Sequence, residues 1–191
     1  LGNKAFPFET ILAELREAMP AVVLHLSVMD PLEIERLVLE QKLHMGIHTF
    51  PNHVPGLRYI KMFDETQILY CGHGHPLFDG DLTYEGAELE TYDYAGRSYY
   101  GGALRPGNLK TKNNHIYAGS MDGIAAAILS GRFLGHLPVQ CAQTWVEQGK
   151  MKPLSTEFHS YKVTFECVFP IGTRMANIKR VLEEVMSKYS A

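Results

Sequence analysis

The sequence has few cysteines, no long apolar run and no excess of positive charge. Its three cysteines, Cys71, Cys141 and Cys167, are an odd number without CxxC spacing, so we expect no disulfide framework and a reducing, cytoplasmic location. No apolar run approaches the roughly 20 residues of a membrane-spanning helix, so we expect no membrane partner. The 18 basic and 21 acidic residues give a net charge of −3, without a basic run dense enough to bind nucleic acid.

Motifs of catalysis and of metal binding are missing as well. The chain has no GxSxG, P-loop or GxGxxG motif and no spacing that pairs two carboxylates, so we predict that it is not an enzyme. Nine histidines occur, including His73 and His75 two residues apart, but no HExxH or paired CxxC motif accompanies them. The sequence therefore predicts neither a metal site nor a cofactor.

Residues 120–138 have the most regular pattern of the chain. Apolar residues recur there at helical spacing after Ser120, which stands at the N-cap position, and Gly131 follows where a helix would end. Residues 133–137 form a short apolar run typical of a buried strand, and Pro138 can open the next helix. The end of a strand and the start of a helix then share one edge of the sheet. Small ligands bind at such edges in open α/β sheets.

The remaining pattern alternates between helix and strand. We expect helices over residues 7–19, 31–41, 121–129, from 138 onward, and over 175–189. Strands are expected over residues 22–28, 45–47, 57–64, 67–71, 92–95, 115–118, 133–137 and 161–169. This alternation predicts an α/β fold with a parallel sheet and right-handed crossovers.

The length of 191 residues leaves a single sheet and two lobes that share strands both open. After residue 76 the sequence becomes polar and rich in turns, which favours two lobes. We predict one lobe of residues 1–72 and 169–191 and a second lobe of residues 73–168. Strands near residues 68–71 and 163–168 would cross between them, and a cleft between two such lobes suits a small molecule.

Several landmarks occur in an order that is typical of one family. A first helix ending in MP precedes VVLHLSV, KLHMGI ends at Ile47, HPL begins at His75, and AAAILSGRFLGHLP comes later. In these landmarks, over essentially the whole chain, the sequence resembles the effector-binding domain of LysR-type transcriptional regulators. The resemblance implies two Rossmann-like lobes joined by two crossover strands, with a ligand cleft between them, as in type 2 periplasmic binding proteins. Phe133 and Leu134 stand where the family usually has glycine and isoleucine, which implies a bulkier pocket wall.

The resemblance also implies which residues contact the small-molecule effector. In the family, loops at strand ends surround the effector. On this chain those loops contain Gly2, Asn3, Lys4, Asp30, Pro31, Thr49, Phe50, Arg97, Ser98, Tyr99, Tyr100, Ser120, Met121, Phe133, Gly135 and His136.

The chemistry of the charged candidates suggests a carboxylate. Arg97 can bind a carboxylate through two parallel hydrogen bonds, although a solvated loop arginine is the alternative. The amides at the helix start behind Ser120 can hold an anion. Asp30 would repel a carboxylate at the start of the other helix, so that end favours an amine or a hydroxyl group.

The aromatic candidates suggest an aromatic effector, with a structural alternative for each. Tyr99, Tyr100 and Phe133 can stack on an aromatic ring, or they can pack locally. His136 lies within an apolar run, where a hydrogen-bonded core histidine is the alternative to a ligand-binding one. The identity of the effector stays open between a carboxylate and an aromatic compound.

The family also implies partners. The resemblance implies a homodimer or a homotetramer, in which the helix over residues 7–19 would pair with another subunit; the alternative is that it packs only within its own lobe. DNA would be bound through an N-terminal winged helix-turn-helix that is absent from these residues. A free-standing solute-binding protein, which delivers a small molecule to a transporter, would have the same fold and is the rival interpretation.

Overall fold

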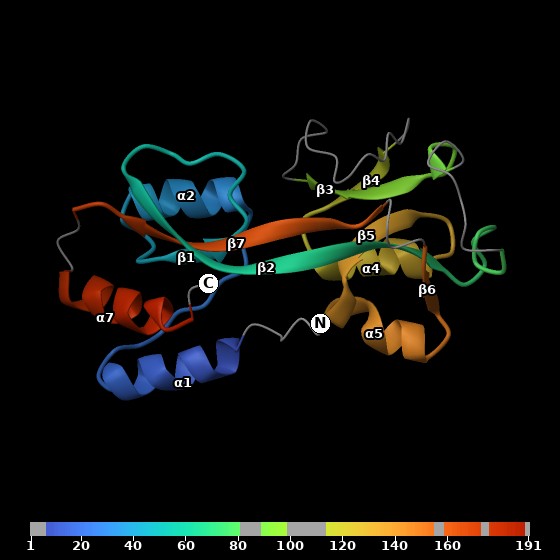
Figure 1. Ribbon diagram of the computed structural model, residues 1–191. Coiled ribbons are helices and arrows are strands. Elements are labelled where there is room, and N and C mark those ends of the chain that lie inside the picture. Colours follow the sequence, from blue (N-terminus) through green and yellow to red (C-terminus); the bar gives the residue numbers. More distant parts are fainter. Residues whose placement is uncertain (1–6, 81–88, 99–113, 155–158, 173–175, 190–191) are drawn as a thin grey trace. The chain divides into compact units, whose positions relative to one another are not determined.

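The computed structural model divides the chain into two compact units (Figure 1). It describes residues 7–80, 89–98, 114–154, 159–172 and 176–189. Unit 1 comprises residues 1–65 and 163–191, and unit 2 comprises residues 66–162. Two long strands, β2 (Leu57–Gly72) and β7 (Tyr161–Pro170), contribute residues to both units. The division thus falls inside these strands, whereas the predicted boundaries at residues 72 and 169 lie near their ends.

Unit 1 is a small sheet with helices on both faces (Figure 1). Its strands follow the order β1 (Gly46–His48), β7 and β2, and β1 is antiparallel to β7. Neighbouring residues of β7 point to opposite faces. Val168 therefore packs in a buried cluster with α2 (Pro31–Leu39), while Cys167 and Phe169 pack in a cluster with α1 (Phe8–Ala18) and α7 (Ala176–Ser187). The predicted helices over residues 7–19 and 31–41 are confirmed.

The same sheet continues in unit 2, in the order β2, β5 (Leu134–Pro138), β3 (Tyr94–Arg97) and β4 (Asn114–Ala118). The strands β5, β3 and β4 are parallel, and β2 is antiparallel to β5. Helix α4 (Met121–Leu129) packs on this sheet, and α5 (Val139–Glu147) follows β5 directly. A short strand, β6 (Met151–Pro153), pairs with β2.

Glycines let α4 lie close against the sheet. A Cβ atom on Gly72 of β2 would stand 2.0 Å from the carbonyl oxygen of Ile128, so only glycine fits there. Gly131 has a φ of +69° and ends the turn after α4, as its position in the sequence predicts. The N-cap prediction is confirmed too, because the Ser120 side chain accepts a hydrogen bond from the Gly123 amide at 3.2 Å.

Several expectations are wrong. Residues 22–28, whose sequence is typical of a strand, form none; their exposed apolar side chains include Val23, Leu26 and Val28. The two strands expected over residues 57–71 are one continuous strand, β2, because the polar residues between them stay in the extended run. The sheet is mixed rather than parallel, since β2 runs against β5 and β1 against β7. Strand β6 was not expected, because its three residues carry too little pattern to identify.

Candidate functional site

In unit 2, four of the predicted residues lie in one region, at the carboxyl ends of the parallel strands and the start of α4. Arg97 ends β3 beside Ala118, the last residue of the parallel strand β4. Two residues later Ser120 caps α4, and Met121 is the first residue of that helix. Ser98, which is exposed, follows Arg97 directly. The carboxyl ends of β3 and β4 and the amino end of α4 therefore meet here.

This region of unit 2 combines the amino end of a helix with a guanidinium group. The amino end of α4 carries a partial positive charge, and its first amides have no carbonyl partner within the helix. The Arg97 guanidinium lies against the sulfur of Met121, with Nη2 directed at Sδ. A thioether is a weak acceptor, so among the described residues this contact leaves the cation with most of its hydrogen-bonding capacity. Asp122, exposed in the first turn, compensates part of the helix dipole.

The remaining unit 2 candidates lie elsewhere. Phe133 precedes β5, and the register of β5 with β3 puts it at the opposite end of the sheet from Arg97. Phe133 packs against the core beside α4. This contact agrees with the alternative that Phe133 packs locally and does not stack on an effector. Gly135 lies within β5, where an added Cβ would come within 3.0 Å of the Ile128 side chain. Gly135 therefore lets β5 pack closely against α4.

His136 has the contacts of a core histidine. It is 3% exposed, and its ring joins two other parts of unit 2. Its Nε2 lies 2.7 Å from the carbonyl oxygen of His159, which can only accept, so Nε2 carries the proton. Its Nδ1 therefore accepts from the Tyr94 hydroxyl, also at 2.7 Å. Burial lowers the pKa of His136 to about 4, so the ring is neutral at physiological pH.

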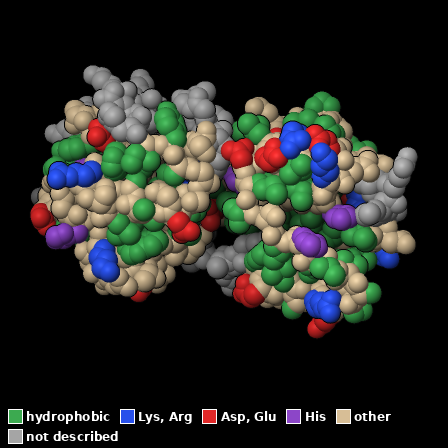
Figure 2. Space-filling model, turned by 180° about the vertical axis from the view of Figure 1, so that it is seen from behind, with side chains coloured by type: hydrophobic (Ala, Val, Ile, Leu, Met, Phe, Trp, Pro, Cys, Tyr) green, Lys and Arg blue, Asp and Glu red, His purple; other side chains and the backbone are tan. Residues whose placement is uncertain are grey.

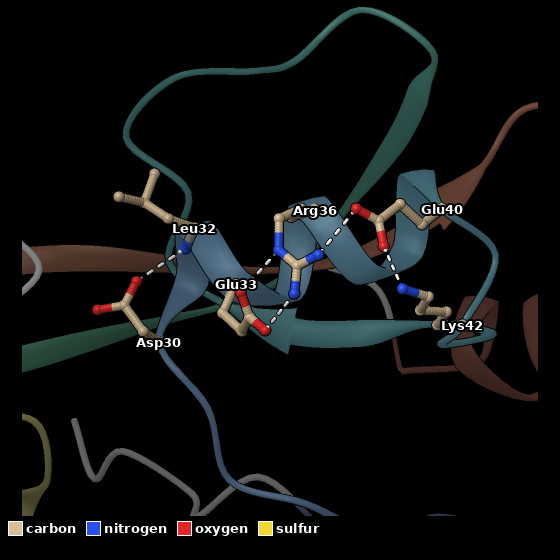
Figure 3. Close-up of polar contacts among 6 residues, drawn as sticks. All are labelled: Asp30, Leu32, Glu33, Arg36, Glu40 and Lys42. Atoms are coloured by element: carbon tan, nitrogen blue, oxygen red, sulfur yellow. Dashed lines mark hydrogen bonds and ion pairs between the residues drawn. The ribbon is translucent and has the colours of Figure 1, made fainter.

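The unit 1 candidates lie at the start of α2 and after β1. Asp30 caps α2 by accepting from the Leu32 amide at 2.9 Å, and Pro31 occupies the first helical position (Figure 3). Thr49 and Phe50 follow β1 directly and are both buried. The Thr49 amide donates to Nδ1 of His48 at 2.7 Å.

The charge pattern of α2 does not favour an anion in unit 1. The Asp30 carboxylate already occupies the amino end of the helix. Further along, Arg36 bonds Glu33 at 2.5 Å and Glu40 at 2.8 Å, and Lys42 joins Glu40 (Figure 3). These exposed pairs satisfy the basic groups of the helix, and their contribution to stability is small.

A buried contact in unit 1 escaped the sequence analysis. The Tyr59 hydroxyl donates to Oε1 of Glu35 at 2.5 Å and accepts from the Val54 amide at 3.0 Å. Phe50 meets the Tyr59 ring edge-on at a centroid distance of 5.4 Å, and His53 stacks on it at 3.9 Å. Tyr59 thus fixes the loop after Thr49. No sequence pattern indicated the pair, because Glu35 and Tyr59 are 24 residues apart.

Two further observations concern the described residues as a whole. They contain no group of three or more His, Cys, Asp or Glu side chains that could hold a metal ion. Within the same residues, no helix combines the length and the apolar character needed to cross a membrane. Of the predicted effector contacts, Gly2, Asn3, Lys4, Tyr99 and Tyr100 lie outside the described part of the chain.

A family model described as "LysR substrate binding domain" matches residues 7–189. The chain belongs to this family. Among curated proteins, the chain is 34% identical over 178 residues to the HTH-type transcriptional activator BauR of Pseudomonas aeruginosa. The match covers 91% of this chain and 58% of BauR, so the chain spans a little over half the length of that relative.

Several solved structures share the fold. The oxidised form of OxyR superposes with a TM-score of 0.74 at 14% identity, over 96% of this chain and 89% of that one. The regulatory domain of CrgA, a LysR-type regulator from Neisseria meningitidis, gives a TM-score of 0.70 at 19% identity, over 96% and 92% of the two chains. The predicted α/β fold of the type 2 periplasmic binding proteins is therefore confirmed. The fold alone would suit a free-standing solute-binding protein equally, and the LysR family match decides in favour of the regulator domain.

Proposed function

We propose that this LysR substrate-binding domain senses a small carboxylate, and that Arg97 and the amino end of α4 recognise its charge. The observation that supports this most is the position of Arg97 at the end of β3, beside the capped start of α4, with a weak sulfur acceptor as its contact. Guanidinium groups bind carboxylates through two parallel, charge-assisted hydrogen bonds. The backbone amides at the amino end of a helix add further hydrogen-bond donors to an anion.

The candidates of unit 1 give a separate expectation about ligand chemistry. Asp30 places a carboxylate at the start of α2, where an amine or a hydroxyl group would be bound and a second carboxylate repelled. Thr49 and Phe50, the other candidates of unit 1, lie on the loop that Tyr59 holds. Taken by itself, unit 1 therefore favours an amine or a hydroxyl group at the start of α2.

For the full-length protein we propose transcriptional regulation in the cytoplasm. DNA would be bound by an N-terminal helix-turn-helix outside this chain, in a homodimer or a homotetramer with α1 at the subunit interface. Effector binding would shift the population of domain arrangements and so alter the affinity for DNA. The relative BauR is named as a transcriptional activator of the helix-turn-helix type, which agrees with this proposal.

The test is a calorimetric titration of this chain with small carboxylates that differ in their amine, hydroxyl and aromatic groups. The double variant Arg97→Ala with Ser120→Ala should bind the best of them at least tenfold more weakly, a loss of about 1.4 kcal/mol. Arg132→Ala, which removes an exposed arginine of the same unit, is the matched control and should bind like the wild type. An affinity of the double variant within about threefold of the wild type would reject the proposed carboxylate site.

A further inference from the structure

The side chain of Tyr59 joins three parts of unit 1. Its hydroxyl donates to Oε1 of Glu35 in α2 at 2.5 Å and accepts from the Val54 amide at 3.0 Å. His53 stacks on its ring at a centroid distance of 3.9 Å, with the two ring planes 7° apart. Phe50 meets the same ring edge-on. Strand β2, which carries Tyr59, thus holds both α2 and the loop after β1 through one side chain.

Burial makes the bond between Tyr59 and Glu35 a strong one. Glu35 is 5% exposed, so its carboxylate has lost most of its water and needs a donor inside the protein. Burial and the bond to Glu35 raise the pKa of Tyr59 to about 12, so the hydroxyl keeps its proton at physiological pH. A hydrogen bond to a charged group is stronger than one between neutral groups. Removing the hydroxyl should therefore displace the groups that this bond holds.

The chain after α2 returns along this helix, so β1 ends near the start of α2. The Leu43 amide bonds the Leu37 carbonyl at 3.1 Å, close to the end of α2. Gly46 lies further back against Ile34, where an added Cβ would stand 2.1 Å from Cγ2. Between these two contacts the chain moves towards the amino end of α2, and β1 continues in that direction. Extended residues advance about 3.3 Å each and helical ones about 1.5 Å, so Thr49 reaches the first residues of the helix.

Two candidates of unit 1 depend on Tyr59 for their position. Thr49 and Phe50 are 8% and 6% exposed, so their positions follow from the side chains packed behind them. Phe50 contacts the Tyr59 ring, and Thr49 precedes Phe50 directly in the chain. The same loop also reaches the surface: His53 exposes 56% of its side chain, and histidine side chains are visible on the surface of unit 1 (Figure 2). A ligand in solution therefore has access to this loop.

We propose that Tyr59 and Glu35 are positioning residues for ligand binding by unit 1. Their hydrogen bond holds Thr49 and Phe50 near the start of α2, where Asp30 favours an amine or a hydroxyl group. Because these residues are held in advance, they lose little conformational freedom when a ligand binds. This role rests on the ligand chemistry proposed for unit 1, which is separate from the carboxylate site proposed in unit 2.

The test titrates the isotope-labelled chain with ethanolamine, which carries an amine and a hydroxyl group and no carboxylate. The amide signals of Thr49 and Phe50 in NMR spectra report the affinity. Tyr59→Phe keeps the ring and removes the hydroxyl, so it should weaken ethanolamine binding at least about fivefold. Glu35→Leu breaks the same bond without leaving a buried charge and should weaken binding as much. Glu35→Gln keeps an oxygen that accepts from Tyr59, so its affinity should stay within about twofold of the wild type.

Tyr189→Phe is the matched control. The Tyr189 hydroxyl also donates to a glutamate of unit 1, Glu14, but on the face of the sheet that α1 and α7 cover. Its removal should leave ethanolamine binding within about twofold of the wild type. Circular dichroism checks that every variant is folded, because the affinity of a fully folded chain does not depend on its stability.

A double-variant cycle separates positioning from a general weakening of unit 1. Thr49→Val nearly keeps the shape of the side chain and removes its hydroxyl, and it should weaken ethanolamine binding at least about fivefold. If Tyr59 acts through Thr49, the double variant Thr49→Val with Tyr59→Phe should bind little more weakly than the weaker of the two single variants. Independent effects would instead multiply to about 25-fold or more.

Two kinds of result would overturn the proposal. Losses that multiply, or a Tyr59→Phe variant that binds like the wild type while Thr49→Val binds weakly, would show that Tyr59 positions nothing for binding. A wild-type chain that does not bind ethanolamine, or a Thr49→Val variant that binds it equally well, would reject the ligand chemistry proposed for unit 1 and this role with it. The carboxylate site of unit 2 is tested separately, by the double variant of Arg97 and Ser120.

Discussion

Acidification should destabilise unit 2 through one buried histidine. His136 is held neutral between the Tyr94 hydroxyl and the His159 carbonyl, and burial lowers its pKa to about 4 from an ordinary value of 6.5. A histidine whose pKa is lowered by folding stabilises the folded state above its unfolded pKa, and this stability is lost as the pH falls towards the folded pKa. The whole shift corresponds to about 3 kcal/mol, of which about 2 kcal/mol is lost between pH 7 and pH 5.

The single tryptophan makes this loss measurable in unit 2. Trp145 lies in α5 and packs against the unit 2 core, so its fluorescence follows the unfolding of that unit. Urea titrations at pH 7 and pH 5 should show the midpoint falling by about 1 M, for a dependence of about 2 kcal/mol per molar urea. His75 and His159, whose pKa values burial also lowers, add to the loss in the same direction.

A variant separates His136 from the other two histidines. His136→Gln keeps a donor and an acceptor but does not titrate, so its unfolding free energy should fall by about 2 kcal/mol less than that of the wild type between pH 7 and pH 5. His73→Gln replaces an exposed histidine of the same unit and should keep the wild-type dependence. If His136→Gln and the wild type lose equal stability on acidification, the assignment of this dependence to His136 is wrong.

Three further substitutions test the packing and the hydrogen bonds of the two units. Ser120→Ala removes the α4 cap and should cost about 1 kcal/mol of unfolding free energy, measured by Trp145 fluorescence in urea. Gly72→Ala should cost at least about 3 kcal/mol in the same assay, because its Cβ would collide with the Ile128 carbonyl. Tyr59→Phe leaves the buried Glu35 without its donor, and circular dichroism in urea should show a loss of about 1.5–3 kcal/mol.

Each of these substitutions has its own control or refuting result. Ser130→Ala keeps the α4 cap and should stay within about 0.5 kcal/mol of the wild type. Gly149→Ala meets no atom within 4 Å, and its φ of +67° alone should cost about 1 kcal/mol. A loss as small for Gly72→Ala would mean that β2 and α4 separate easily. An unchanged stability of Tyr59→Phe would show that water replaces the hydroxyl beside Glu35.

Local signals predicted the parts of the fold that local interactions determine. Ser120 and Asp30 were recognisable as caps because the capping bonds reach only two or three residues along the chain. Both helices follow directly from these positions. The proposal of an anion site rests on signals of the same kind, since the starts of helices and the ends of strands carry their own sequence signals.

The parts that failed depend on partners far away in the chain. Residues 22–28 have the composition of a strand, yet a strand exists only with a neighbour, and composition does not report whether one is present. Tyr94 and His136 are 42 residues apart, so no spacing rule shows that they bond. The aromatic contacts of Tyr59 were missed for the same reason. Such contacts follow from the packing of several elements at once.

The central claim is that small-molecule binding in this domain controls DNA binding by the full-length protein. The most direct measurement is the affinity of the full-length protein for the DNA upstream of its own gene, with and without the best carboxylate from the calorimetric titration. We predict at least about a fivefold change in DNA affinity, and an equal change in carboxylate affinity when DNA is saturating, because coupling between two sites is reciprocal. A carboxylate that binds the domain and leaves the DNA affinity unchanged would contradict the account.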